Sequence, residues 1–243
     1  LANRINARFA TTICVTFEDT LKYTGEKGVH TGTPIRPELY LGRRAKGLEF
    51  LGFSGAKPVL LVMGGSLGAA AINDAVRGSL DALTRSFDVV HLCGKDKVDA
   101  KLLCEDCYRQ FEFVGPELPD VFAATDLAVS RAGANAVFEF LALAKPALLI
   151  PLPLSASRGD QILNAGYFAR KGYSMVLEQE KLSPKTLLDA VNDLYDRRLS
   201  FVATMSAEAL ADGTDEVLSA IRSALYESRR KKRASGKHDD FAE

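Results

Sequence analysis

Residues 57–73 read KPVLLVMGGSLGAAAIN, an apolar run that ends in glycines and is followed by a helical pattern. Val and Leu residues without polar alternation are typical of a strand covered on both faces, as in a parallel sheet. After the glycines, apolar residues recur at helical spacing from Ala71 to Leu80 and predict a helix over about 68–84. This stretch therefore predicts a buried strand, a tight turn and an amphipathic helix in direct succession.

The same alternation of apolar runs and amphipathic stretches continues along the chain. The pattern predicts strands at 87–93, 111–114, 126–130, 146–152 and 173–178, and helices at 95–108, 117–124, 134–144 and 160–171. Alternating strands and helices imply an open parallel sheet, wound right-handed, with helices on both faces. The predicted fold class is therefore α/β with a Rossmann-like parallel sheet.

From Ser183 onward the pattern is helical only. SPKTLLDAVNDLYDRR, residues 183–198, begins with a Ser N-cap followed by Pro at the first helical position. Two further helices are expected at about 200–210 and 214–227. Residues 228–243 are polar and charged, and we expect them to form a disordered tail.

The amino-terminal region does not fit this sheet. ATTICVTF (10–17) and GVHTGTPI (28–35) predict two strands joined by a short helix or turn. Because two strands alone do not make a stable domain, we expect residues 1–40 to be the end of a preceding domain. A linker is expected at 41–56, and the main domain at 57–227.

Composition narrows the classes of function. The 243 residues include 31 basic and 31 acidic side chains, and no basic strip is interleaved with aromatic residues, which argues against nucleic-acid binding. No apolar stretch reaches the roughly 20 residues that cross a bilayer. Four cysteines in a chain of this length do not form a disulfide framework, which favours a cytosolic protein. Cys104 and Cys107 form a C-x-x-C, but no second ligand pair with zinc spacing exists, so metal or redox use is not expected.

The glycine turn after the first strand is the first candidate site. Gly64 and Gly65 allow a tight turn, and Ser66 offers a hydroxyl and an amide at the start of the helix. Free N–H groups and the positive end of the helix dipole at such a place hold phosphate. The alternative is that the glycines only allow the helix to pack on the sheet.

The second candidate is SRAGANAVFEFLA, residues 130–142. A turn of small residues ending in Gly133 precedes a helix, and Glu139 lies about one and a half turns into it. A carboxylate near the carboxyl end of a parallel sheet is well placed to accept hydrogen bonds from a ribose diol. The alternative is a solvent-facing glutamate, as most helical glutamates are.

The third candidate is the polar loop SASRGDQ, residues 155–161, and the helix that follows it. Gln161 and Asn164 are three residues apart and share one helix face, and amides that donate and accept suit sugar hydroxyls. Either amide could instead cap or decorate the helix. All three turns follow parallel strands, so together they predict a nucleotide site for a diphosphate with a sugar-like group.

No nucleophile or metal constellation is present in the sequence. His30, His91 and His238 are scattered, and His91 falls within a strand pattern, where we expect a hydrogen-bonded core histidine. The motifs G-x-S-x-G, H-E-x-x-H and the Walker A lysine pattern are missing. An NAD-binding domain fits less well, because GGSLGA lacks the G-x-G-x-x-G spacing.

Four stretches together resemble the MurG-type glycosyltransferases of bacteria, which belong to glycosyltransferase family 28 and have the two-domain GT-B fold. The matching stretches are GTPIR (32–36), GGSLGAAAIN (64–73), SRAGANAVFEFLALAKPALLIPLP (130–153) and RGDQILNA (158–165). They occur in the family's order and approximate spacing. The chain departs from the family pattern at Asp160, where a glutamine is common, and at Ala136, where Thr or Ser is frequent.

The resemblance implies a donor-binding half. The donor-binding residues that it implies are Arg36, Gly64, Gly65, Ser66, Val114, Gly133, Ala134, Asn135, Ala136, Val137, Phe138, Glu139, Gln161 and Asn164. Arg36, Ser66 and the turn 134–137 are expected at the diphosphate, and the backbone of Val114 at uracil. Glu139 is expected to hold the ribose, and the Gln161 and Asn164 amides the N-acetylglucosamine hydroxyls.

The resemblance also implies the reaction, an inverting, metal-independent transfer of N-acetylglucosamine from UDP-N-acetylglucosamine to an undecaprenyl-pyrophosphoryl-muramoyl-pentapeptide lipid. No cofactor is expected. The family's amino-terminal domain, with the acceptor site and the catalytic base, has no counterpart here, so the chain is expected to be a fragment that is inactive alone. The full-length protein is expected in the cytoplasm, peripheral on the inner face of the cell membrane.

Two other functions remain open at this point. A related diacylglycerol glycosyltransferase would share the same donor loops but use another acceptor. A non-catalytic nucleotide-sugar-binding subunit of a split transferase would work only by docking a separate acceptor subunit.

Overall fold

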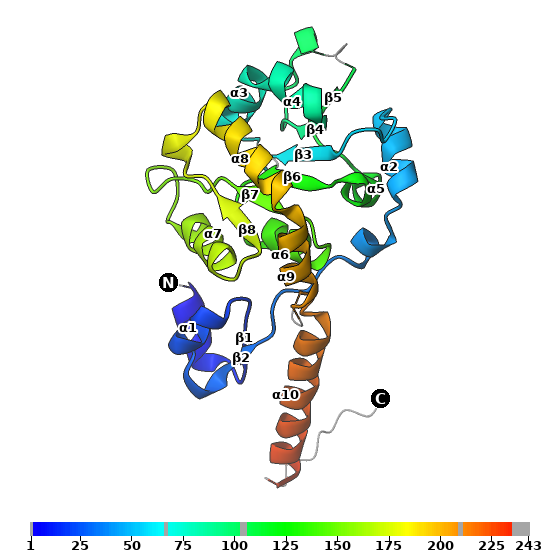
Figure 1. Ribbon diagram of the computed structural model, residues 1–243. Coiled ribbons are helices and arrows are strands. Elements are labelled where there is room, and N and C mark those ends of the chain that lie inside the picture. Colours follow the sequence, from blue (N-terminus) through cyan, green and yellow to red (C-terminus); the bar gives the residue numbers. More distant parts are fainter. Residues whose placement is uncertain (1, 66–67, 103–105, 209–210, 235–243) are drawn as a thin grey trace. The chain divides into compact units, whose positions relative to one another are not determined.

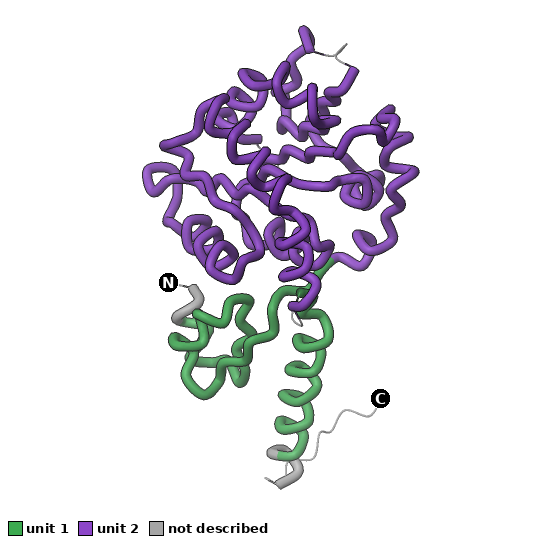
Figure 2. The backbone as a smooth tube through the Cα atoms, viewed as in Figure 1, with its two compact units in different colours: residues 1–35, 209–243 green, residues 36–208 purple. Residues whose placement is uncertain are grey.

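The computed structural model describes residues 2–65, 68–102, 106–208 and 211–234. The chain divides into two compact units, one of residues 36–208 and one of residues 1–35 with 209–243 (Figure 2). Figure 1 shows their helices and strands.

The larger unit is built on a six-stranded sheet. Its strands are β3 (Val59–Met63), β4 (Asp88–Leu92), β5 (Tyr108–Phe111), β6 (Leu127–Ser130), β7 (Ala147–Leu149) and β8 (Ser174–Val176). They lie in the order β5-β4-β3-β6-β7-β8, and all neighbours are parallel. This arrangement confirms the predicted Rossmann-like α/β class.

Helices cover both faces of this sheet (Figure 1). They are α2 (Arg44–Leu51), α3 (Ala70–Gly78), α4 (Leu80–Ser86), α5 (Leu118–Ala124), α6 (Ala134–Ala142), α7 (Asp160–Arg170), α8 (Pro184–Asp196) and α9 (Arg198–Ser206), with short 3-10 segments η3 (Pro37–Leu41), η4 (Ala100–Leu102) and η5 (Gln179–Lys181). Leu60 and Val62 of β3 share one buried cluster with Ile72 of α3 and Val191 of α8. Successive residues of a strand point to opposite faces of the sheet, and helices bury both faces of β3. This burial explains why β3 is apolar throughout rather than at every second position.

Three expected elements differ from the structure. The helix expected over 68–84 is two helices, because α3 ends at Gly78 and the hydroxyl of Ser79 donates to the carbonyl of Ala75 at 2.8 Å. The expected helix over 95–108 is wrong, since its described residues form turns and η4. The strand expected at 111–114 lies at Tyr108–Phe111, where Tyr108 is buried, whereas Phe113 is 76% exposed.

The carboxyl-terminal helices confirm the predicted all-helical segment. The side chain of Ser183 accepts a hydrogen bond from Thr186 N–H, and the Thr186 hydroxyl accepts one from Ser183 N–H. This capping box fixes the start of α8. The last helix, α10 (Thr214–Ala234), runs past the end expected at 227, so part of the expected tail is helical.

The smaller unit contains α10 and the amino-terminal elements. These are α1 (Ala2–Phe9), β1 (Ile13–Val15), η1 (Glu18–Tyr23), η2 (Gly25–Lys27) and β2 (Gly28–His30). The two strands are parallel and pair with each other. The sequence predicted two strands joined by a short helix or turn, but not their parallel pairing. The Asp212 carboxylate accepts hydrogen bonds from Ile35 N–H and Thr214 N–H, which anchors the start of α10 within this unit.

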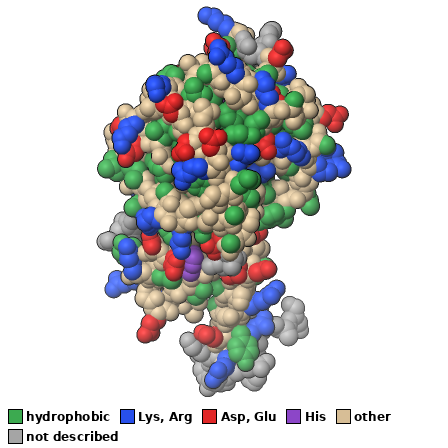
Figure 3. Space-filling model, in the orientation of Figure 1, with side chains coloured by type: hydrophobic (Ala, Val, Ile, Leu, Met, Phe, Trp, Pro, Cys, Tyr) green, Lys and Arg blue, Asp and Glu red, His purple; other side chains and the backbone are tan. Residues whose placement is uncertain are grey.

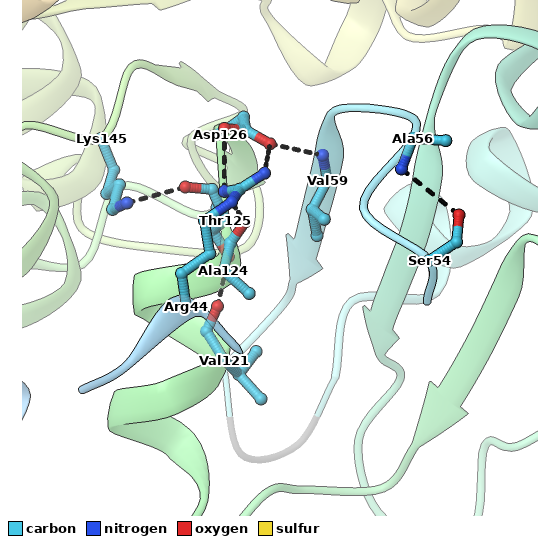
Figure 4. A network of polar contacts seen from close by, with 9 residues as sticks. All are labelled: Arg44, Ser54, Ala56, Val59, Val121, Ala124, Thr125, Asp126 and Lys145. Carbon is cyan, nitrogen blue, oxygen red and sulfur yellow. Dashed lines mark hydrogen bonds and ion pairs between the residues drawn. The ribbon is translucent and has the colours of Figure 1, made fainter. Parts of the chain in front are cut away.

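A polar network ties α2 to the amino edge of the large sheet (Figure 4). The Arg44 guanidinium donates to both oxygens of Asp126, each at 3.1 Å, and to the carbonyl of Ala124. Asp126 Oδ2 also accepts from Val59 N–H at 2.8 Å, at the start of β3. The segment expected as a linker therefore carries a helix that packs on the larger unit; the predicted division into domains stays a prediction.

The face drawn in Figure 3 has no single dominant charge. On the face drawn in Figure 3, Lys and Arg side chains are interspersed with Asp and Glu side chains, in keeping with the 31 basic and 31 acidic residues of the sequence. Within the described part of the chain, no helix is both long and apolar enough to cross a membrane.

Candidate nucleotide-sugar site

Three turns follow neighbouring strands at the carboxyl edge of the sheet. Met63 at the end of β3 is the register partner of Ser130 at the end of β6, which in turn pairs with Leu149 of β7. The turns after these strands, the three predicted from the sequence, therefore begin side by side. The chain leaves β3 toward β4 and β5 and returns to β6, so β3 and β6 flank the topological switch point, where open α/β sheets bind ligands.

The turn after β3 requires glycine. A Cβ on Gly64 would lie 2.4 Å from the backbone nitrogen of Ala69, and Gly65 has a φ of 83°. A larger residue at either position would displace the chain just before α3 begins. Ser66 lies outside the described residues, so its contact with phosphate stays a prediction.

The turn after β6 presents the start of α6. Gly133 is the N-cap of this helix, and no side chain caps it. Among the described residues other than its chain neighbours, no atom lies within 4 Å of the place a Cβ on Gly133 would occupy. The amino end of α6 therefore offers N–H groups next to open space, as an anion site requires. Ala134, Asn135 and Ala136 form this first turn, and Asn135 is exposed.

Val137 and Phe138, also predicted at the site, have core side chains. Val137 is 1% exposed and Phe138 is 4% exposed, and the Phe138 ring packs edge-on against Phe168 of α7 at 5.2 Å between centroids. Contacts of these two residues with a ligand are therefore restricted to their backbone atoms.

Glu139 is paired with Arg36. The Nε and a terminal nitrogen of Arg36 lie 3.0 and 2.9 Å from the same oxygen, Oε1, of Glu139. The Glu139 side chain is 12% exposed and that of Arg36 is 56% exposed. Glu139 is therefore not a solvated helix glutamate. The sequence predicted both residues at the site but not the ion pair between them.

Arg36 also lines a cavity of about 350 Å³. The other lining residues are Glu38 and Leu39 of η3 and Gly115, Pro116, Leu118 and Pro119 of the β5–α5 segment. Val114, predicted to meet uracil through its backbone, directly precedes Gly115. The structure thus brings Arg36 to the segment that follows Val114.

Gln161 and Asn164 both hold backbone groups of the neighbouring turns. Gln161 Oε1 accepts a hydrogen bond from Leu152 N–H at 3.1 Å, after β7. Asn164 Nδ2 donates to the carbonyl of Ala132 at 3.0 Å, after β6. Both amides therefore lie at the carboxyl edge, and each uses one polar atom for the fold.

Arg131 is a residue of this edge that the sequence reasoning missed. It is 9% exposed and donates to the carbonyls of Ile150 and Pro151 and to the side chain of Gln179. Burial lowers the pKa of its guanidinium. The sequence did hold one sign that Arg131 is unusual. It stands between the buried strand β6 and a turn of small residues, where a long cationic side chain has little room.

His91 is a core histidine, as predicted. It is 0% exposed, its Nδ1 lies 2.8 Å from the Tyr108 hydroxyl, and its Nε2 lies 3.0 Å from Asn73 Oδ1. Burial, with a smaller contribution from Arg77, lowers its pKa to about 3. Among the described residues, no group of three or more His, Cys, Asp or Glu side chains could hold a metal ion; Cys104 lies outside them.

A doubly wound parallel sheet with glycine and small-residue turns at its switch point defines a Rossmann-type domain of the nucleotide-binding class. Residues 59–221 match the family described as the glycosyltransferase family 28 C-terminal domain, and the chain belongs to this family.

Relatives and solved structures agree with this family. The UDP-N-acetylglucosamine–N-acetylmuramyl-(pentapeptide) pyrophosphoryl-undecaprenol N-acetylglucosamine transferase of Clostridium tetani is 46% identical over 91% of this chain, and that of Lachnoclostridium phytofermentans is 50% identical over 91%. The alignments span 62% of each relative, so the chain covers less than two thirds of their length. The crystal structure of Acinetobacter baumannii MurG has a TM-score of 0.62 at 23% identity, over 88% of this chain and 59% of that one. The predicted MurG-type resemblance is confirmed, as is the predicted Rossmann-like α/β half of a GT-B fold.

Proposed function

We propose that this chain is the donor-binding part of an enzyme that transfers N-acetylglucosamine from UDP-N-acetylglucosamine to an undecaprenyl-pyrophosphoryl-muramoyl-pentapeptide lipid. The observation that carries the proposal is the 46–50% identity to transferases named for this reaction, over 91% of the chain. The three turns at the switch point lie where open α/β sheets bind nucleotides, which supports the proposal.

The diphosphate would lie between the turn at Gly64 and the amino end of α6. Helix N-termini favour anions because their first N–H groups are unpaired and carry a partial positive charge. The Arg36 guanidinium, anchored on Glu139, adds a cation whose charge the carboxylate partly offsets. During transfer, these groups would stabilise the negative charge that develops on the departing UDP.

The nucleoside would lie over Glu139 and the segment around Val114. Arg36 uses only Oε1 of Glu139, so Oε2 is outside that ion pair and can accept hydrogen bonds from a ribose diol. The cavity beside Arg36 and Gly115 would accept the uracil ring, whose polar edge would meet backbone groups of Val114.

The sugar would face α7. Gln161 Nε2 and Asn164 Oδ1 are the atoms that the bonds to Leu152 and Ala132 do not use. One is a donor and the other an acceptor, and this combination suits sugar hydroxyls.

The acceptor lipid and the base that deprotonates its hydroxyl would be handled by a part of the whole protein outside this chain. We further propose that the whole protein works at the inner face of the cell membrane, where a lipid-linked acceptor is exposed to a nucleotide sugar.

Calorimetric titration of the 243-residue chain with UDP, UDP-N-acetylglucosamine and UDP-glucose tests the proposal. We expect binding of UDP and of UDP-N-acetylglucosamine, no sugar transfer by the chain alone, and weaker binding of UDP-glucose. A folded chain that binds no uridine nucleotide would refute the proposed donor site.

A further inference from the structure

Arg131 carries a buried charge, and no acidic side chain among the described residues pairs with it. One terminal nitrogen lies 3.0 Å from the Ile150 carbonyl and 3.3 Å from that of Pro151, and the other lies 2.5 Å from Gln179 Oε1. These acceptors are all neutral, and burial alone accounts for the lowered pKa of the guanidinium. Burying a cation without a carboxylate costs free energy. If Arg131 only filled space in the fold, an apolar side chain of similar size would stabilise it more.

The bonds of Arg131 belong to a closed circuit. Arg131 holds the carbonyls at the exit of β7, and the next N–H group, that of Leu152, donates to Gln161 Oε1 of α7. Asn164, one turn further along α7, donates back to the carbonyl of Ala132, the neighbour of Arg131. The circuit therefore joins the turn after β6, the turn after β7 and α7.

This circuit fixes which way the two amides point. An N–H group opposite Gln161 requires the amide oxygen there, and a carbonyl opposite Asn164 requires its amide nitrogen. Gln161 Nε2 and Asn164 Oδ1 are thereby directed away from these bonds. If the segment after β7 moved, the Leu152 N–H group would move with it, and Gln161 would lose its orientation.

We propose that Arg131 is a positioning residue for the sugar half of the donor, acting through the carbonyls of Ile150 and Pro151 on Gln161 rather than by touching the ligand. This inference rests on the proposed donor site. It differs from a purely electrostatic role, in which the Arg131 charge would attract the diphosphate whatever the sugar.

Two variants separate these roles. Arg131→Met removes the charge and the fork of donors, whereas Arg131→Lys keeps a charge but cannot bridge two carbonyls and Gln179 with one planar group. The readout is the sugar increment, defined as the dissociation constant of UDP divided by that of UDP-N-acetylglucosamine, measured by calorimetry on the 243-residue chain. We expect both variants to reduce the increment by roughly tenfold, the effect of one or two lost hydrogen bonds, with little change for UDP.

A control is Arg44→Met, which removes from the opposite edge of the sheet a guanidinium that bonds the Ala124 carbonyl and the Asp126 carboxylate. It should lower the melting temperature and leave the sugar increment unchanged. If Arg131→Met does not fold, as judged by circular dichroism, Gln179→Leu replaces it. That variant removes only one acceptor of the guanidinium and should reduce the increment in the same direction, by less.

The inference is overturned if Arg131→Lys behaves as wild type while Arg131→Met weakens UDP and UDP-N-acetylglucosamine equally. It is also overturned if the wild-type chain shows no sugar increment, or if the increment survives in every Arg131 and Gln179 variant. Those results leave uridine binding by the wild-type chain intact. Loss of uridine binding in the wild-type chain itself would instead refute the proposed function.

Discussion

The guanidinium of Arg36 and the carboxylate of Glu139 form an ion pair across 103 positions of sequence, with Nε and a terminal nitrogen on the single oxygen Oε1. The Arg36 side chain is 56% exposed and that of Glu139 is 12% exposed, so the pair ties an exposed cation to a mostly buried carboxylate. One carboxylate thus has two functions in the proposed mechanism: it fixes Arg36 with one oxygen and offers the other to the ribose.

Glu139→Ala should weaken UDP and UDP-N-acetylglucosamine by the same factor, roughly tenfold, because both carry the ribose and both face Arg36. The substitution removes the ribose acceptor and releases Arg36 together. Titration calorimetry with both ligands measures the factor, and Glu49→Ala, on the exposed surface of α2, is the control that should bind as wild type. A loss confined to the ligand with the sugar would contradict the assignment of Glu139 to the nucleoside.

Gly133→Ala should weaken UDP binding without lowering stability. A Cβ there meets no atom within 4 Å among the described residues other than its chain neighbours, and φ is −68°, so the folded chain accommodates alanine. A diphosphate at the helix start, in contrast, would be crowded. Gly64→Ala is the contrasting variant, since its Cβ would collide with Ala69, and should destabilise the fold by about 1–3 kcal/mol. Thermal melts and UDP titrations of both variants give the comparison; unchanged UDP affinity in Gly133→Ala would place the diphosphate elsewhere.

Acid should destabilise the fold through His91. Its pKa is lowered from 6.5 to about 3, first by burial and then by Arg77, so below pH 6.5 the unfolded chain binds a proton that the folded chain does not. This contribution to stability is complete above pH 6.5 and is lost as the pH falls toward 3, at up to about 1.4 kcal/mol per pH unit. Urea unfolding between pH 7 and pH 4.5 should show a shallower loss for His91→Gln than for wild type, and equal slopes would exclude His91 as the source.

Asp126→Ala should destabilise the larger unit by about 1–3 kcal/mol, because it leaves Val59 N–H without its acceptor at the start of β3. The exposed ion pair with Arg44 contributes little of this. Asp126→Asn, which retains an acceptor for that N–H group, should recover most of the loss. Urea unfolding measures both variants, and their UDP affinities should match wild type; an effect on UDP would mean that the two edges of the sheet are coupled.

The strands and helices with strong periodicity were predictable because local pattern and tertiary burial agree in them. β3, β6 and α7 lie within a residue or two of their expected limits. β5 was misplaced because FEFV looks more strand-like than YRQF, whereas the structure buries Tyr108, whose hydroxyl meets His91 across the sheet. That partner is 17 positions away, and no local pattern contains it.

The site was predictable as a set of turns but not as a set of contacts. Gly64, Gly133 and Glu139 stand out from their own neighbours in sequence, and topology alone brings their turns together. The partners of Arg36 and Arg131 depend on distant segments, and neither arginine has a periodicity that would reveal them.

The two ends of β3, which has five residues, have different roles. At its start, Val59 N–H donates to Asp126 and anchors the strand, whereas at its end Met63 leads into the glycine turn of the candidate site. At about 3.3 Å per residue, Val59 and Met63 are about 13 Å apart. For protein engineering, this spacing separates the part of the domain that can be varied from the part that must be kept. Under the proposed function, a library confined to the loops after β3, β6 and β7 that keeps Gly64 and Gly65 would sample new donor preferences, while the anchoring of Arg44, Asp126 and Val59 holds the amino edge of the sheet.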